Sequence, residues 1–130
     1  MKKLIILILA AMLLTACGQN KENNKESSYM NITAEEAKAI MDREEGYIIL
    51  DVREQEEYNQ GHIPGAILIP YTEIKAKAET VLTDKDQLIL VYCRSGRRSK
   101  IAAEALVELG YTNIKEFGGI INWPYEVEVS

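Results

Sequence analysis

Two short apolar runs constrain the fold of this chain more than any other feature of its sequence. The segments YIILDVR (residues 47–53) and QLILVYC (residues 87–93) stay apolar without the alternation expected of a half-exposed strand. Continuous runs of this length are typical of strands buried on both faces, as in a parallel sheet covered by helices. The sequence therefore predicts an α/β domain with a mostly parallel sheet.

Helical signals lie on either side of these runs. Thr33 and Glu36 have the spacing of a capping box and open a predicted helix over residues 32–44. A second helix is predicted over residues 99–110, with apolar residues at helical spacing and Gly110 as its C-terminal cap. Shorter segments complete the pattern, with strands expected at 65–70 and 112–119 and a closing turn or helix at 120–127.

The N-terminus has the features of a secretory signal. Its apolar run, Leu4 to Leu14, would reach only ~17 Å as a helix, too short for a hydrocarbon core of ~30 Å. The exit Leu14-Thr15-Ala16-Cys17 resembles the lipobox of bacterial lipoproteins. The resemblance implies a signal peptide at residues 1–16, cleavage before Cys17, and acylation of that cysteine.

A lipid-modified Cys17 would place the protein in the cell envelope. Two or three acyl chains would anchor the protein on the membrane, facing outside the cytoplasm. The polar residues 17–28 then form a tether, or a disordered remnant with no spacing role, ahead of a domain at 29–130. An ordinary secretory signal or an anchor helix, with Cys17 incidental, is the alternative.

Charge and residue counts exclude several kinds of partner. Without Lys2 and Lys3 the processed chain keeps 13 basic and 20 acidic residues, a poor match for nucleic acid. One histidine and one unmodified cysteine cannot build a typical tetrahedral metal site, so neither a metal nor another cofactor is expected. The oligomeric state cannot be predicted from the sequence.

Cys93 is the candidate nucleophile because of the stretch VYCRSGRRSK at residues 91–100. A thiol reacts as the thiolate, and three features favour that form: four cationic side chains, the N-terminus of the following helix, and a glycine-permitted loop of inward amides. The cations are Arg94, Arg97, Arg98 and Lys100. A structural, inert cysteine beside solvated arginines is the alternative.

Three longer segments resemble the single-domain rhodanese family. They are LDVREQEEYNQGHIPGAILIP, VYCRSGRRSKIAAEALVELGY and EFGGIINW, and with their spacing the resemblance covers residues 32–125. It implies a doubly wound sheet of about five mostly parallel strands flanked by helices, and sulfurtransferase activity. The family's nucleophile matches Cys93, and its six-residue active-site loop matches Cys93 to Arg98, with Arg94, Ser95, Gly96 and Arg97 between them.

The expected chemistry is a double displacement. Cys93 would attack the outer sulfur of an anionic donor such as thiosulfate, expel sulfite, and pass the sulfur of its persulfide to cyanide or a thiol. Loop amides would stabilise the charge on sulfur, and Arg94, Arg97 and Arg98 would attract and orient the donor. This chemistry requires a sulfur that is both ionised and within reach of solvent.

Residues outside the loop have more ordinary interpretations. Asp51 and Arg53 end a neighbouring strand and support the site, either from its edge or by pairing with each other or with neighbouring elements. Ser99 occupies the sixth position after the expected nucleophile and is grouped with these supporting residues. His62 is expected in a structural turn, with a general base as the alternative. Trp123 is expected in core or rim packing, with a place in the lining of the pocket as the alternative.

Two other functions remain open. Cysteine-dependent phosphatases and arsenate reductases are disfavoured, because phosphatases need arginine in the sixth place after cysteine, where this chain has Ser99. A non-turnover persulfide carrier would retain Cys93 and relay sulfur to a partner. Mercaptopyruvate is a less suitable donor, since that subfamily has Cys-Gly-Ser-Gly-Val-Thr in its loop.

Overall fold

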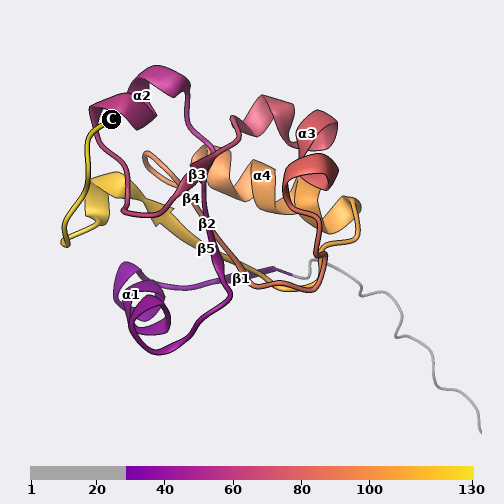
Figure 1. Ribbon diagram of the computed structural model, residues 1–130, viewed down its shortest axis with the longest axis horizontal. Coiled ribbons are helices and arrows are strands. Elements are labelled where there is room, and N and C mark those ends of the chain that lie inside the picture. The colour runs from indigo at the N-terminus through magenta and orange to yellow at the C-terminus, as the bar shows by residue number, and fades with distance from the viewer. Residues whose placement is uncertain (1–28) are drawn as a thin grey trace, which may run out of the picture.

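Five strands form one sheet, and every neighbouring pair is parallel. The computed structural model describes residues 29–130 (Figure 1). Its strands are β1 (Tyr29–Asn31), β2 (Ile48–Asp51), β3 (Ile67–Leu68), β4 (Ile89–Cys93) and β5 (Ile114–Gly119), in the order β1-β5-β4-β2-β3. The predicted signal peptide, Cys17 and the tether lie outside the described residues.

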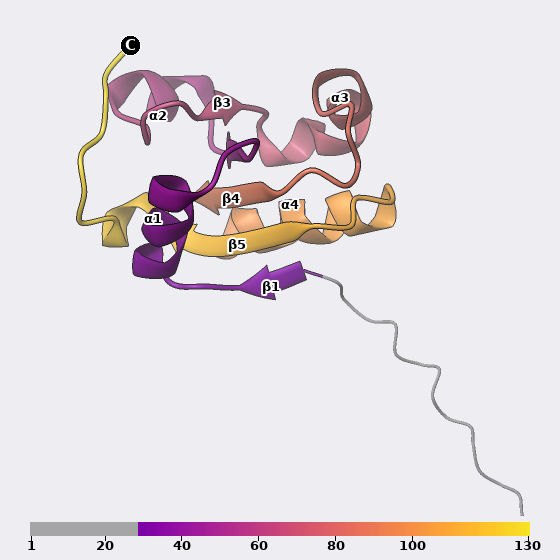
Figure 2. The ribbon, with the colours of Figure 1, turned by 60° about the horizontal axis from the view of Figure 1, so that its bottom comes forward.

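Among residues 29–130, four helices lie around this sheet. They are α1 (Ala34–Arg43), α2 (Gln55–Gln60), α3 (Ile74–Val81) and α4 (Arg97–Glu108), with short 3-10 turns η1 (Tyr71–Glu73) and η2 (Ile120–Asn122). Helix α1 lies on the opposite side of the sheet from α3 and α4 (Figure 1). Figure 2 shows β1, β5 and β4 side by side with their arrows pointing the same way. The predicted α/β architecture is confirmed.

Each face of the sheet has its own apolar core. Under α1 the core includes Ala37, Ile40, Leu90, Tyr92, Phe117 and Trp123. Under α3 and α4 it includes Leu50, Val91, Cys93, Ala102, Leu106 and Ile114. Because β4 is buried at all five positions, its C-terminal residue reaches the edge of the sheet already surrounded by protein.

The predicted elements form where the sequence placed them. Thr33 accepts the amide of Glu36 at 3.0 Å, and the Glu36 carboxylate accepts the amide of Thr33 at 2.9 Å, so α1 begins with the expected capping box. The two apolar runs become the neighbouring strands β2 and β4, which pair from Ile48 with Ile89 onward. Helix α4 starts at Arg97, two residues earlier than its apolar periodicity indicated.

The sequence pattern did not predict β1, α2 or α3. The edge strand β1 is three residues long and mostly exposed, and α2 buries no residue, so neither has an apolar pattern. Helix α3 buries only Ile74 and Ala78. No helix among residues 29–130 combines the length and apolar character that crossing a bilayer requires.

Candidate active site

Cys93 ends the central strand β4 and begins a tight loop into α4. The turn ends at Gly96, whose φ of 115° lies in the left-handed region that glycine adopts most readily. Because all strands are parallel, this loop lies at the same edge of the sheet as the end of β2. This is the edge at which α/β proteins bind ligands.

The sulfur of Cys93 is surrounded by hydrogen-bonding groups of its own loop. The amide of Gly96 donates to Sγ at 3.0 Å, and the Ser99 hydroxyl lies 3.4 Å from Sγ. Burial raises the pKa of the Cys93 thiol, but hydrogen bonds from the Ser99 hydroxyl and from the amides of Ser99, Gly96 and Ser95 outweigh it, so the pKa falls below its ordinary value. Of the predicted inward amides, that of Gly96 makes a direct hydrogen bond to the sulfur.

The expectation that solvent reaches this sulfur is wrong for the described structure. Cys93 is only 1% exposed. The Gly96 amide and the Ser99 hydroxyl contact its sulfur, and the residue also belongs to the apolar core under α3 and α4. A donor can contact Sγ only after nearby atoms move aside.

Three of the four cations of the loop contact partners other than the sulfur. Arg97 stacks over the Tyr71 ring at 5.8 Å from its centroid, and Lys100 contacts Glu116 at 3.2 Å. Arg98 makes two hydrogen bonds to the Glu57 carboxylate, at 2.8 and 2.9 Å. These three side chains are therefore held by other partners, although the charges of Arg98 and Cys93 still attract each other. The largest contributions to the lowered pKa of Cys93 come from amides and a hydroxyl rather than from these side chains.

Arg94 takes a different position, at the wall of a small cavity. The cavity has a volume of about 200 Å³ and lies between the active-site loop, the end of α2 and η2. Arg53 and Glu57 also line it, so two basic residues and one acidic residue border a space of a few water molecules.

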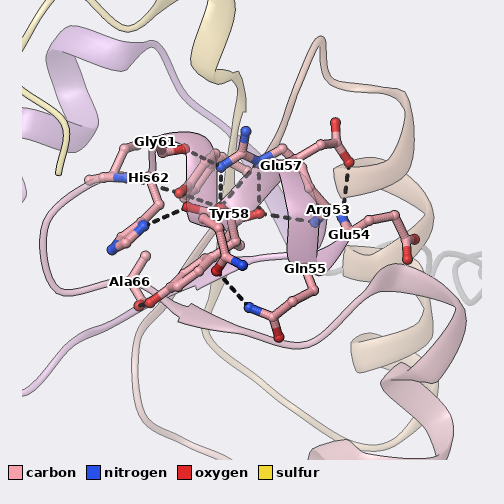
Figure 3. Close-up of polar contacts among 12 residues, drawn as sticks. Arg53, Glu54, Gln55, Glu57, Tyr58, Gly61, His62 and Ala66 are labelled. Atoms are coloured by element: carbon pink, nitrogen blue, oxygen red, sulfur yellow. Dashed lines mark hydrogen bonds and ion pairs between the residues drawn. The ribbon is translucent and has the colours of Figure 1, made fainter. Parts of the chain in front are cut away.

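Asp51 and Arg53 pair with each other beneath this cavity. Arg53 donates to the buried Asp51 carboxylate from Nη2 at 2.7 Å and from Nε at 3.0 Å. Tyr92 donates its hydroxyl to Asp51 at 2.6 Å and accepts the amide of Ile63 at 3.1 Å. Figure 3 shows Arg53 reaching the carbonyl of Gly61, at 2.7 Å. The predicted mutual pairing is present, and it joins β2, β4 and the segment after α2.

The end of β5 closes the loop from the other side. Gly118 has a φ of 87°, and Gly119 lies in register with Cys93. A Cβ on Gly119 would lie 1.9 Å from the carbonyl oxygen of Arg94, so only glycine fits this approach. Gly119 therefore controls the position of the loop backbone.

His62 and Trp123 pack against neighbouring aromatic rings, which is typical of a structural role. The His62 ring stacks on Tyr58 at a centroid distance of 3.8 Å, and its Nδ1 lies 2.8 Å from the Tyr58 carbonyl oxygen (Figure 3). Trp123 packs against Phe117 at 5.7 Å between ring centroids. Among residues 29–130, no three His, Cys, Asp or Glu side chains gather as metal ligands would.

Three residues near the site were missed by the sequence analysis. Glu57 holds Arg98, Gly119 admits the loop, and Glu116 lies buried beside Ser99. The position of Glu116 had a readable signal, because it falls on the same face of β5 as the buried Ile114. The other two depend on contacts between distant segments.

Comparisons with known proteins identify relatives of the whole domain. The rhodanese-like domain family matches residues 33–124. Thiosulfate sulfurtransferase PspE of Escherichia coli is 45% identical over 71 residues, which cover 55% of this chain and 68% of that protein. The Bacillus subtilis protein named "Putative sulfur carrier protein YrkF" is 36% identical over 112 residues, covering 85% of this chain and 60% of that protein.

Solved structures agree with these matches. The structure described as "rhodanese with anions from E. coli" has a TM-score of 0.61 and 38% sequence identity to this chain. It covers 65% of this chain, and the match includes 99% of that chain.

Proposed function

Since this chain belongs to the rhodanese family, we propose that it is a sulfurtransferase that carries sulfane sulfur on Cys93, from an anionic donor such as thiosulfate to a thiol or cyanide. Membership supports sulfur transfer in general. The finer proposal depends on one observation: a single free thiol among residues 29–130 lies within hydrogen bonds that favour its thiolate.

The proposed reaction has two displacements. The Cys93 thiolate attacks the outer sulfur of thiosulfate; the new S–S bond forms as the old one breaks, and sulfite leaves with the electron pair. The acceptor then attacks the outer sulfur of the Cys93 persulfide and restores the thiolate. Amides of Ser95, Gly96 and Ser99 stabilise the anionic sulfur at both stages.

The donor would wait in the cavity at Arg94 before it reaches the buried sulfur. Arg53 and Arg94 would attract an anion there, while the Glu57 carboxylate, which also lines the cavity, is paired with Arg98. Opening of the loop would bring the outer sulfur of the donor to Sγ. Arg97 and Arg98, which have partners of their own, would support the loop rather than bind the donor. Ser99 would donate to the thiolate, while the Asp51–Arg53 pair fixes the neighbouring strand end.

A persulfide carrier is the second candidate, favoured by the similarity to YrkF. Steady-state kinetics with thiosulfate and cyanide separate the two functions. A sulfurtransferase gives saturation and many turnovers, and Cys93→Ser abolishes them; a carrier loads one sulfur per chain and then stops. Full activity of Cys93→Ser would contradict both.

The proposal extends to the N-terminus. Residues 1–16 would act as a signal peptide, and acylated Cys17 with the tether to residue 28 would hold the domain 29–130 at the outer face of a membrane. Support comes from the lipobox-like sequence Leu14-Thr15-Ala16-Cys17 alone.

Cell fractionation tests this attachment. The native protein is expected in the membrane fraction, and Cys17→Ser is expected to release it, because the acyl chains are lost. A purified native protein whose Cys17 carries no lipid would contradict the anchor.

A further inference from the structure

Glu116 is a buried carboxylate that the reaction described above does not use. Glu116 is 1% exposed and lies on the face of β5 that packs against α4. Three donors surround the carboxylate: the Ser99 hydroxyl, the Gly118 amide at 2.9 Å and the Lys100 ammonium at 3.2 Å. A carboxylate so surrounded is an acceptor in the resting protein.

Ser99 links this carboxylate to the sulfur. Its Oγ lies 3.4 Å from Cys93 Sγ and in short contact with Glu116 Oε2. The carbonyl oxygens of Gly96 and Gly118 are farther away, at 3.1 and 3.3 Å. A hydroxyl has one proton to donate, so while Cys93 is protonated Ser99 donates to Glu116 and its oxygen accepts the Cys93 S–H.

We infer that Glu116 receives the proton of Cys93 through Ser99, and this inference rests on the proposed function of Cys93 as the sulfur nucleophile. The S–H proton passes to Ser99 Oγ as the hydroxyl proton passes to Glu116 Oε2. Sulfur becomes a thiolate, the carboxylate becomes a neutral acid, and Ser99 now donates to the sulfur. When the acceptor has removed the outer sulfur from the persulfide, the proton returns by the same two steps.

Burial explains why an internal proton acceptor is useful here. Water has little access to a residue that is 1% exposed, so direct loss of the proton to solvent is hindered. Two adjacent anions in a buried site would repel strongly, but the transfer keeps one negative charge in the pair throughout. Glu116 thus acts as a positioning residue and proton acceptor through Ser99, without touching the reacting atoms.

Other charged and titratable groups face this pair. Lys100 on α4 contacts Glu116 directly, and Arg98 and Cys93 attract each other electrostatically. Burial is the largest cause that raises the pKa of Tyr29 on β1, and the charges of Glu104 and Glu116 raise it further. None of these groups lies between Ser99 and Glu116, so substitution of Glu116 by glutamine isolates the proton acceptor.

The test measures how fast Cys93 reacts with iodoacetamide as pH changes. The full chain carries Cys17→Ser, so that Cys93 is its only thiol. With the relay, the rate is nearly constant between about pH 5 and 8, because the proton is transferred within the protein. Glu116→Gln should lower the rate at pH 6 at least about tenfold, and the rate should then rise about tenfold per pH unit below the thiol pKa.

A competing explanation, in which Glu116 has only a packing role, predicts the opposite change in the alkylation rate. If Glu116 only packs, removing its charge favours the nearby thiolate, and the rate stays constant or rises. Ser99→Ala should reproduce the pH profile of Glu116→Gln, and the double variant should match either single one. Additive losses, or a chain inert to the reagent at every pH, would overturn the inference.

Two controls complete the design. Glu104→Gln removes the same charge from the exposed side of α4 and should keep the original profile. Mass analysis after thiosulfate is run on the same samples. If no sulfur adduct forms but the pH profiles are those expected of the relay, the proposed donor chemistry is refuted and the relay is not. If the adduct forms but Glu116→Gln leaves the pH profile unchanged, the relay is refuted and the donor chemistry is not.

Discussion

The Glu57–Arg98 ion pair provides a quantitative test of how α2 holds the active-site loop. Hydrogen bonds from Arg98 and from the Glu54 amide, opposed by burial, lower the pKa of Glu57 from 4.5 to about 2. In this chain the Glu54 amide donates to Glu57 Oε1 at 2.9 Å. The substitution Glu57→Gln removes the charge but keeps an oxygen that can accept this hydrogen bond. Loss of stability should therefore report the ion pair.

The magnitude follows from the shift in pKa. A change from 4.5 to about 2 corresponds to about 3 kcal/mol of folding free energy if nothing else intervenes. The Glu57 side chain is 28% exposed, so solvent screening reduces this contribution. We expect Glu57→Gln to lower the free energy of unfolding by about 1–2 kcal/mol at pH 7.

The pH dependence has a defined sign. A carboxyl whose pKa is lower in the folded state stabilises the fold above its unfolded pKa and loses that contribution as the pH falls. The difference between the original chain and Glu57→Gln should be complete above about pH 4.5 and should vanish near pH 2. Urea unfolding of the full chain at several pH values measures it.

Glu56→Gln is the matched control. It removes the same charge from the same first turn of α2, where Glu56 is exposed and makes no hydrogen bond or ion pair with the rest of residues 29–130. Its unfolding free energy should change by less than about 0.5 kcal/mol. Equal effects of the two substitutions, or a Glu57→Gln loss that persists at pH 2, would refute the ion-pair explanation.

Two further substitutions test the packing around the site. Gly119→Ala should reduce kcat/KM about 100-fold, because its Cβ displaces the loop. Gly46→Ala, where a Cβ would meet open space outside the site, should lower stability without changing kcat/KM. Equal kcat/KM values for the two variants would contradict this explanation. Tyr92→Phe should lower the free energy of unfolding by about 3 kcal/mol, since it removes a bond to the Asp51 carboxylate and an acceptor for a buried amide. Tyr111→Phe, which loses one bond to a carbonyl, should cost about 1 kcal/mol, and a reversed order in denaturation experiments would refute the network.

Much of the fold was predictable because burial and sequence pattern coincide. The runs at 47–53 and 87–93 are apolar on both faces, and they became the neighbouring strands β2 and β4. Gly110 follows α4 with a φ of 98°, as its predicted capping role requires. Helix α2 was not predictable from apolar periodicity, since all its residues lie at least partly in solvent.

The site was predictable in its backbone but not in its side chains. The spacing of residues along the chain was sufficient to identify Cys93, the turn at Gly96 and the start of the helix that follows. It could not show that Arg98 would meet Glu57, 41 residues away, because that contact depends on how α2 packs. Neither could it show that Cys93 would be almost completely buried.

The central claim is that Cys93 accepts sulfur from an anionic donor, and intact mass after exposure to thiosulfate tests it most directly. The full chain carrying Cys17→Ser should gain ~32 Da, one sulfur atom, and lose it on addition of cyanide or a thiol. The same chain with Cys93→Ser should gain nothing. An unchanged mass in the first protein, or an equal gain in the second, would contradict the claim.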